Sequence, residues 1–224
     1  DMLTDFTQQM IYGHTTGEAF NYANTKNKSN YTEIPVIAGN INKSWANATV
    51  KNGDFESNDS SPRYWNYSGD VRILDSLGSY VHDNNLLFMS TGIGSKSDYN
   101  SSQVSQVFHI PENATTLTFS YNFISEEPME WVGDEYDDEF LTNIYAGTST
   151  STVLRESTNT STWHRTNIAN FYGGDNTMYE TQWKTVTIDV EQYAGKAIKL
   201  EFNVNNVGDN TYNSAVLIDN VLVA

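Results

Sequence analysis

Alternation of apolar and polar residues in short segments is the main pattern along this chain. It is strictest in Thr116–Phe123, where four apolar or aromatic side chains share one face of a strand: Leu117, Phe119, Tyr121 and Phe123. Comparable segments, separated by clusters of Gly, Asn, Asp and Ser that favour turns, are Tyr80–Phe88, Val104–Ile110, Glu139–Ala146, Lys184–Val190, Ala197–Asn205 and Ala215–Val223. Only Val190–Ala194 has helical spacing. The pattern predicts an all-β fold, a two-sheet antiparallel β-sandwich.

The first 47 residues do not share this pattern. Residues 1–47 are polar and rich in Asn, with one apolar patch, Ile34–Ile41. We interpret them as an N-terminal extension or linker from a preceding module, with one candidate strand in that patch. Residues 48–224 then form the sandwich domain.

Composition restricts the class of protein. The 224 residues carry 28 acidic and 12 basic side chains, a formal net charge of −16. Nucleic-acid binding requires clustered Lys and Arg, so this charge argues against it, and it favours a surface that attracts cations.

Cysteine is absent, which excludes disulfides, thiolate metal sites and a cysteine nucleophile. A secreted domain of this kind often gains cross-links from bound Ca²⁺. No apolar run has the length of a membrane helix, and Asp1–Thr4 has no features of a signal peptide. We therefore expect no membrane insertion, an extracellular or cell-surface location, and a monomeric module cut from a longer chain.

The most informative segment is Ser125–Phe140, which connects two predicted strands. Eight acidic residues lie within it: Glu126, Glu127, Glu130, Asp134, Glu135, Asp137, Asp138 and Glu139. Their mutual repulsion is costly unless the loop is solvated or neutralised by an ion, and carboxylate oxygens suit Ca²⁺. A solvated acidic hairpin is the simpler interpretation, but Trp131, Val132 and Tyr136 are interleaved with the acids, which is unusual for an exposed acidic segment.

Catalytic motifs are not apparent. The four histidines (His14, His82, His109 and His164) are scattered, and neither G-x-S-x-G nor H-E-x-x-H occurs. Paired carboxylates would suit a glycosidase, but calcium binding accounts better for the acidic cluster. We expect a protein that is not an enzyme.

The two ends of the predicted sandwich resemble a known family. The segment Asn52-Gly53-Asp54-Phe55-Glu56, a later Trp65 and the terminal Ile218-Asp219-Asn220-Val221 resemble the galactose-binding-like jelly rolls of many carbohydrate-binding modules. That resemblance implies a jelly roll whose two ends pair in one sheet, with a structural Ca²⁺ held by Glu56 and Asp219. A hydrogen-bonded Asp219 at a strand end is the alternative, although its place in an apolar run calls for a partner or cation.

The acidic segment carries a second resemblance. Its pattern, F-x-S-E-E-x-x-E-W-V-G-x-x-Y-D-D-x-F, is similar to the jelly-roll ligand-binding or peptide-binding domains of large RTX-type bacterial adhesins. Gly173–Thr177 and Val207–Asn210 extend the similarity over roughly Val50–Ala224. The resemblance implies a Ca²⁺-dependent site in which the ion captures a carboxylate of a peptide or protein ligand.

The resemblance places the site on three loops. The implied metal ligands are Glu126, Glu127, Asp134, Asp137 and Asp138, with Asp175 and Asp209 from neighbouring loops. The implied ligand-binding residues are Trp131, Tyr136, Tyr172, Asn176 and Asn210.

Two other functions remain open at this point. A carbohydrate-binding module would bind a glycan by stacking sugar rings on exposed aromatic side chains, for which the candidates are Trp65, Trp131, Trp163 and Tyr172. A structural spacer would use Ca²⁺ only to stiffen a fibre and would bind no ligand.

Overall fold

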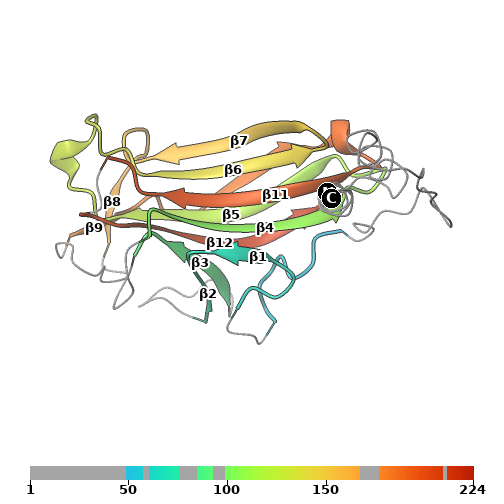
Figure 1. Cartoon of the computed structure of the whole chain (residues 1–224), viewed down its shortest axis with the longest axis horizontal. Helices are drawn as coiled ribbons and strands as arrows, with labels where there is room; N and C mark the ends of the chain where they lie inside the picture. Colours follow the sequence, from blue (N-terminus) through green and yellow to red (C-terminus); the bar gives the residue numbers. More distant parts are fainter. Residues whose placement is uncertain (1–48, 58–60, 76–84, 93–98, 167–176, 209–210) are drawn as a thin grey trace, which may run out of the picture.

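The computed structural model describes residues 49–57, 61–75, 85–92, 99–166, 177–208 and 211–224. The extension 1–47, Tyr172, Asp175, Asn176, Asp209 and Asn210 lie outside these residues. Two antiparallel sheets pack face to face as a jelly-roll β-sandwich (Figure 1), which confirms the predicted fold class. No helix in the described residues is long and apolar enough to cross a membrane.

The first sheet has five strands in the order β1-β4-β11-β6-β7. Their bounds are Asn66–Ser68 (β1), Ser101–His109 (β4), Ala197–Asn205 (β11), Glu139–Ala146 (β6) and Ser149–Ser157 (β7). β4, β6 and β11 lie where alternation predicts strands. β7 was not predicted, because its sequence STSTVLRES is polar and its first four residues are exposed.

The second sheet has the order β2-β3-β12-β5-β9-β8, and β10 also pairs with β5. The bounds are Asp70–Leu74 (β2), Leu86–Ser90 (β3), Thr116–Ser125 (β5), His164–Thr166 (β8), Met178–Glu180 (β9), Lys184–Asp189 (β10) and Ser214–Val223 (β12). β5 and β12 form the centre, paired from Ser214 opposite Ser125 to Val223 opposite Leu117. The predicted helical segment is a single 3-10 turn, Glu191–Tyr193.

Three strands at the beginning of the domain differ from the prediction. β3 covers Leu86–Ser90, whereas the prediction was Tyr80–Phe88, and all five of its side chains are buried. A strand buried on both faces has no polar alternation, so its boundaries are hard to locate from sequence. β1 and β2 were not predicted, because they have only three and five residues and β1 is also polar and exposed.

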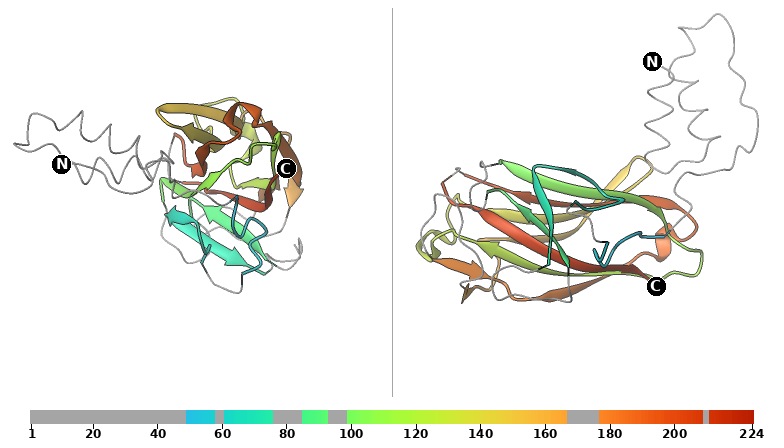
Figure 2. Two further views of the ribbon diagram at one scale, coloured as in Figure 1. Left: turned by 90° about the vertical axis from the view of Figure 1, so that its right-hand side faces the viewer. Right: turned by 90° about the horizontal axis from the view of Figure 1, so that it is seen from below.

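Aromatic rings from both sheets fill the centre of the sandwich. Figure 2 shows the ribbons of the two packed sheets end on and from below. Phe202 lies 5.0 Å from Phe119 of the opposite sheet and 6.1 Å from Phe140 beside it, measured between ring centroids. Trp65 is 5% exposed and packs between Phe55 and Phe202 at 5.6 and 6.1 Å. Trp65 is therefore a core residue, and the suggestion that it stacks on a sugar is wrong.

We expect Trp65→Ala to lower the free energy of unfolding by about 3–5 kcal/mol, because it leaves a large cavity between the rings of Phe55 and Phe202. Urea denaturation measures this change. Tyr67→Ala is the matched control, since Tyr67 is 52% exposed and its removal should change stability by at most about 0.5 kcal/mol. Equal effects of the two substitutions would contradict a core role for Trp65.

Candidate functional site

The acidic loop, residues Glu126–Asp138, leaves β5 and enters β6 at one end of the sandwich (Figure 1). Its two ends are buried and its middle is exposed. Glu126, Glu127 and Asp138 are 1%, 3% and 0% exposed, whereas residues 130–135 are all exposed. The loop therefore presents a solvent-facing tip on a buried acidic base.

Local sequence explains the shape of the tip. Pro128 precedes the 3-10 helix η2, Met129–Trp131, and its carbonyl accepts a 3.0 Å hydrogen bond from the Trp131 amide. Proline has its φ fixed near the helical value, which favours such a start. Gly133 then turns the chain at φ +102°, a conformation that L side chains rarely adopt.

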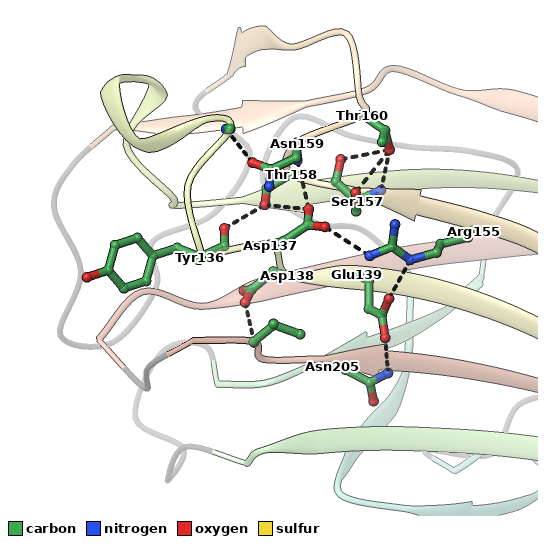
Figure 3. A network of polar contacts seen from close by, with 12 residues as sticks. Tyr136, Asp137, Asp138, Glu139, Arg155, Ser157, Thr158, Asn159, Thr160 and Asn205 are labelled. Atoms are coloured by element: carbon green, nitrogen blue, oxygen red, sulfur yellow. Dashed lines mark hydrogen bonds and ion pairs between the residues drawn. The ribbon is translucent and has the colours of Figure 1, made fainter.

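Asn159, in the connection after β7, fixes the loop from the side. Its side-chain oxygen accepts a hydrogen bond from the Gly133 amide, and its Nδ2 donates to the Asp134 carbonyl at 2.9 Å (Figure 3). Thr158 Oγ1 donates to the Tyr136 carbonyl at 2.7 Å. Sequence analysis missed these two residues, because a polar connection carries no signal of which loop it contacts.

Asp137 is neutralised by the protein itself. Arg155 donates to Asp137 at 2.9 Å and to Glu139 at 2.7 Å, and the Asn159 amide donates to Asp137 at 2.9 Å (Figure 3). Burial alone would raise the pKa of Asp137, but these hydrogen bonds and the charge of Arg155 lower it. The structure thus places Asp137 in an ion-pair network; its predicted role as a calcium ligand stays a prediction.

Asp138 points to the other side of the loop, toward the segment after β11 (Figure 3). Its carboxylate accepts the Val207 amide at 2.8 Å, and the Asn206 side-chain nitrogen, with the amide oriented toward it, donates at 2.8 Å. Gly208 passes so close that an added Cβ would lie 2.7 Å from the Glu135 carbonyl oxygen. Val207 and Gly208, the described part of the predicted companion loop, therefore lie against the acidic loop.

The base of the loop continues into a buried polar cluster. The Glu126 amide donates to the Asn213 carbonyl at 3.0 Å, and the hydroxyls of Ser125 and Ser214 are 2.9 Å apart. Asn213 is fully buried. Glu126 and Glu127 are thus buried where β5 ends and β12 begins, next to this polar cluster.

The tip carries the exposed apolar surface. Trp131 is 45% exposed and Val132 40% exposed, and the Trp131 ring meets the Tyr136 ring edge to face at 5.9 Å. The Tyr136 ring points away from the hydrogen-bond network (Figure 3). Trp163, by contrast, is partly buried against Phe123 at 5.5 Å and donates its indole N–H to Thr158, so it anchors the neighbouring connection.

The second predicted site lies at the other end of β12. Glu56 accepts two hydrogen bonds from Asn85, at 3.0 and 3.1 Å, and the buried Asp219 accepts two from Asn220, at 2.6 and 3.2 Å. Gly53 crosses β12 here, and its carbonyl accepts the Val221 amide at 2.8 Å. The two ends of the domain are therefore joined, as the resemblance implies, and both carboxylates have amide donors.

Neither predicted metal site is complete in the described residues. No three Asp, Glu or His side chains among them come together in a way that could hold a metal ion. The donors that are present, carboxylates with nearby carbonyl and hydroxyl oxygens, have the chemistry that Ca²⁺ prefers. The types of ligand atom suit Ca²⁺, but the described residues do not bring enough of them together, so calcium binding stays a proposal.

Two further carboxylates are held by cations. Glu156 accepts hydrogen bonds from Lys184 at 2.9 Å, from Ser161 and from Tyr121. Glu201 accepts hydrogen bonds from Lys199 and Tyr145, each at 2.7 Å. Burial alone would raise the pKa of Glu156 and of Glu201, but these hydrogen bonds lower both. The pKa of Tyr121 is raised, by burial and by the neighbouring Glu156.

Comparisons with known proteins give only an architectural likeness. No protein-family model and no curated protein matches the chain. The K2 cleaved adhesin domain of Lys-gingipain is 18% identical, with a TM-score of 0.46 over 77% of this chain and 96% of that one. TmCBM61 in complex with β-1,4-galactotriose is 15% identical, with a TM-score of 0.44 over 78% and 96%.

A third solved structure has similar values. The K1 cleaved adhesin domain of Lys-gingipain from Porphyromonas gingivalis W83 is 16% identical, with a TM-score of 0.40 over 70% of this chain and 90% of that one. Similarity at this level leaves the function to be inferred from this chain's own residues. An origin in an RTX-type adhesin is not shown by it.

We expect acid to destabilise the domain through Asp137, Glu156 and Glu201. Their pKa values lie below the ordinary 3.8 for Asp and 4.5 for Glu, so the unfolded chain takes up protons first as the pH falls. Their contribution is complete above about pH 5 and is lost as the pH drops through the lowered values. Urea denaturation between pH 7 and pH 3 measures it.

Glu156→Gln is the matched variant for this measurement. It keeps the shape of the side chain and removes one titrating group, so its stability should depend less steeply on pH below about pH 5. A parent protein equally stable at pH 7 and pH 3 would contradict the expectation.

Proposed function

We propose that the chain is a non-catalytic binding domain of an extracellular adhesin, which holds a peptide or protein ligand on the acidic loop. The observation that carries the proposal is the tip of that loop, where Trp131 and Val132 are exposed while Pro128, Gly133 and Asn159 fix the backbone. An ordered loop loses little conformational entropy on binding, and aromatic side chains are common anchors in protein interfaces. Such a domain would attach a cell or a surface to the molecule that carries the ligand.

Calcium is the second part of the proposal. Glu126 and Glu127 at the loop base are the residues that would hold the ion, and Asp138, buried where the loop returns to β6, is a further predicted ligand. Asp134, Asp175 and Asp209 stay predicted ligands. A bound Ca²⁺ would supply a positive charge and coordination positions for a ligand carboxylate. Buried carboxylates can offset their desolvation by such coordination.

The described carboxylates support a non-catalytic role. A general acid needs a carboxyl group with a raised pKa that faces the substrate, and a nucleophile needs a carboxylate that is not engaged by other groups of the protein. Asp137, Glu156 and Glu201 instead have lowered pKa values because they pair with the protein's own cations. They stabilise the domain, and the acidic loop offers contacts for a ligand.

A carbohydrate ligand is the second candidate, and Trp131 favours it as well. Of the aromatic residues proposed for sugar stacking, Trp65 and Trp163 pack inward, whereas Trp131 remains exposed beside Tyr136. A tryptophan face on a protruding loop can stack on a sugar ring. A glycan array and a displayed peptide library, screened with the same protein, separate the two candidates.

The loop proposal predicts that Trp131→Ala weakens binding at least about tenfold to whichever peptide the library selects, since exposed aromatic anchors contribute about 2 kcal/mol or more. Isothermal titration calorimetry measures the affinity. Tyr67→Ala is the control, because Tyr67 has similar exposure, 52% against 45%, and lies on β1 far along the chain from the loop. Unchanged affinity in Trp131→Ala would exclude the tip as the binding site.

Calcium binding can be measured separately from ligand binding, through its effect on thermal stability. At a free Ca²⁺ concentration of about 100 Kd, the ion should stabilise the fold by about 2.7 kcal/mol and raise Tm by about 5–10 °C over the protein in EDTA. Glu127→Gln should reduce this rise if the loop base holds the ion, and Glu56→Gln should reduce it if the second site does. Identical Tm values in Ca²⁺ and EDTA would refute both sites.

A further inference from the structure

A pocket lies at the opposite end of β5 from the acidic loop. It has a volume of about 370 Å³ and is lined by Val50, Asn52, Gly53, Asp54, Thr118, Ser120, Thr185, Asn220, Val221 and Leu222. Leu117, Phe119 and Tyr121 of β5 face the core, so Thr118 and Ser120, which alternate with them, face outward. The pocket therefore sits on the outer side of the second sheet, and its volume is in the range of small-molecule sites.

An irregularity in β12 creates the pocket. The pairing of β12 with β5 shifts between Asp219 and Leu222, and Asn220 adopts φ +56° there. Gly53 lies against this bulge, and an added Cβ would be 2.1 Å from the Val221 carbonyl oxygen. Bulges re-aim side chains and occur often beside functional sites. The crossing at Gly53 fixes the bulge, so the pocket is preformed.

Hydroxyl groups form the floor of the pocket. Ser120 Oγ and Thr185 Oγ1, on paired strands, lie 3.0 Å apart and share a hydrogen bond. Each hydroxyl can both donate and accept, so the pair keeps capacity for a ligand. Asn220 and Asp54 also line the pocket, and they carry an amide and a carboxylate group. The polar groups are thus mostly neutral, and both donors and acceptors are present.

The wall of the pocket is apolar. Leu222 is 60% exposed, the most exposed large hydrophobic side chain in the described residues, and Val50 lines the pocket with it. An exposed leucine on a strand next to a hydroxyl floor offers one apolar and one polar side to a ligand. A pyranose ring has this character, with C–H groups on its faces and hydroxyls around its edge.

We propose that this pocket is a second binding site, for a neutral saccharide unit. Leu222 contacts a C–H face of the sugar ring, while Thr185, Ser120 and Asn220 hydrogen-bond its hydroxyls. Charge excludes other classes: Asp54 and the net charge of −16 repel anions, and a single carboxylate in the lining is too few for a divalent cation. None of the described residues that line the pocket is aromatic, so hydrogen bonds provide most of the selectivity.

The site is distinct from the acidic loop and does not depend on the proposed function. Titration of ¹⁵N-labelled domain with galactose, glucose, mannose, N-acetylglucosamine, lactose and maltose, each in EDTA, tests it by chemical-shift changes. At least one sugar should bind with a Kd of about 1 mM or tighter and shift the amides of Thr118, Ser120, Thr185 and Asn220. Trp131→Ala should leave this binding unchanged.

Two substitutions provide the decisive comparison. Thr185→Val removes one floor hydroxyl without changing the side-chain shape, so the sugar should bind about fivefold more weakly. Thr187→Val is the control, since Thr187 is exposed two residues further along β10 and does not line the pocket. Leu222→Ser should also weaken binding, through the apolar wall.

The proposal is overturned if no sugar in the panel shifts the pocket amides, or if the shifts lie only at the acidic loop. It is also overturned if Thr185→Val and Thr187→Val bind with the same affinity. Loss of peptide binding in Trp131→Ala with sugar binding intact would confirm two separate sites. Absence of peptide binding with sugar shifts in the pocket would reject the loop and keep this site.

Discussion

The packing of aromatic rings around Phe202 is the interaction on which the rest of the domain depends. A chain without cysteine has no disulfide to join its layers, so burial of apolar surface must do so. Phe202 contacts Phe119 across the sandwich and Trp65 from the segment before β1. One side chain thereby joins the two sheets and the beginning of the domain. The positions of the loops at the two ends of the sandwich follow from this arrangement.

The acidic loop is ordered mainly by hydrogen bonds within the protein. Asp137 pairs with Arg155, Asp138 accepts amides from the segment after β11, and Asn159 fixes the tip. Repulsion among the acids is thus partly relieved without an ion, which weakens the inference from acidity to calcium. The inference now depends on Glu126 and Glu127, whose burial at the base is the feature that coordination to Ca²⁺ would explain.

Sequence alone predicted the strands with clear alternation and also β12, which is a long apolar run, but it misplaced β3 and missed β7. β5 and β11 each have one buried face, so their periodicity is visible, whereas β3 is buried on both faces and β7 is polar throughout its first half. The candidate site shows the same limit. Trp131 and the acids could be identified from their order in the chain, but Asn159 could not, because its contacts depend on which loops meet at one end of the sandwich.

The two candidate surfaces lie on the same strand but far apart. Thr118 in the pocket and Ser125 at the loop base are seven residues apart on β5, which corresponds to about 24 Å at the rise of an antiparallel strand. A monosaccharide in the pocket cannot reach the loop tip, so the two sites should fill independently. A partner that carried both a peptide segment and a glycan could occupy both at once, and its second contact would then be intramolecular. Two weak sites on one rigid strand can in this way give strong attachment to a glycosylated surface, and selectivity for partners that carry both chemistries.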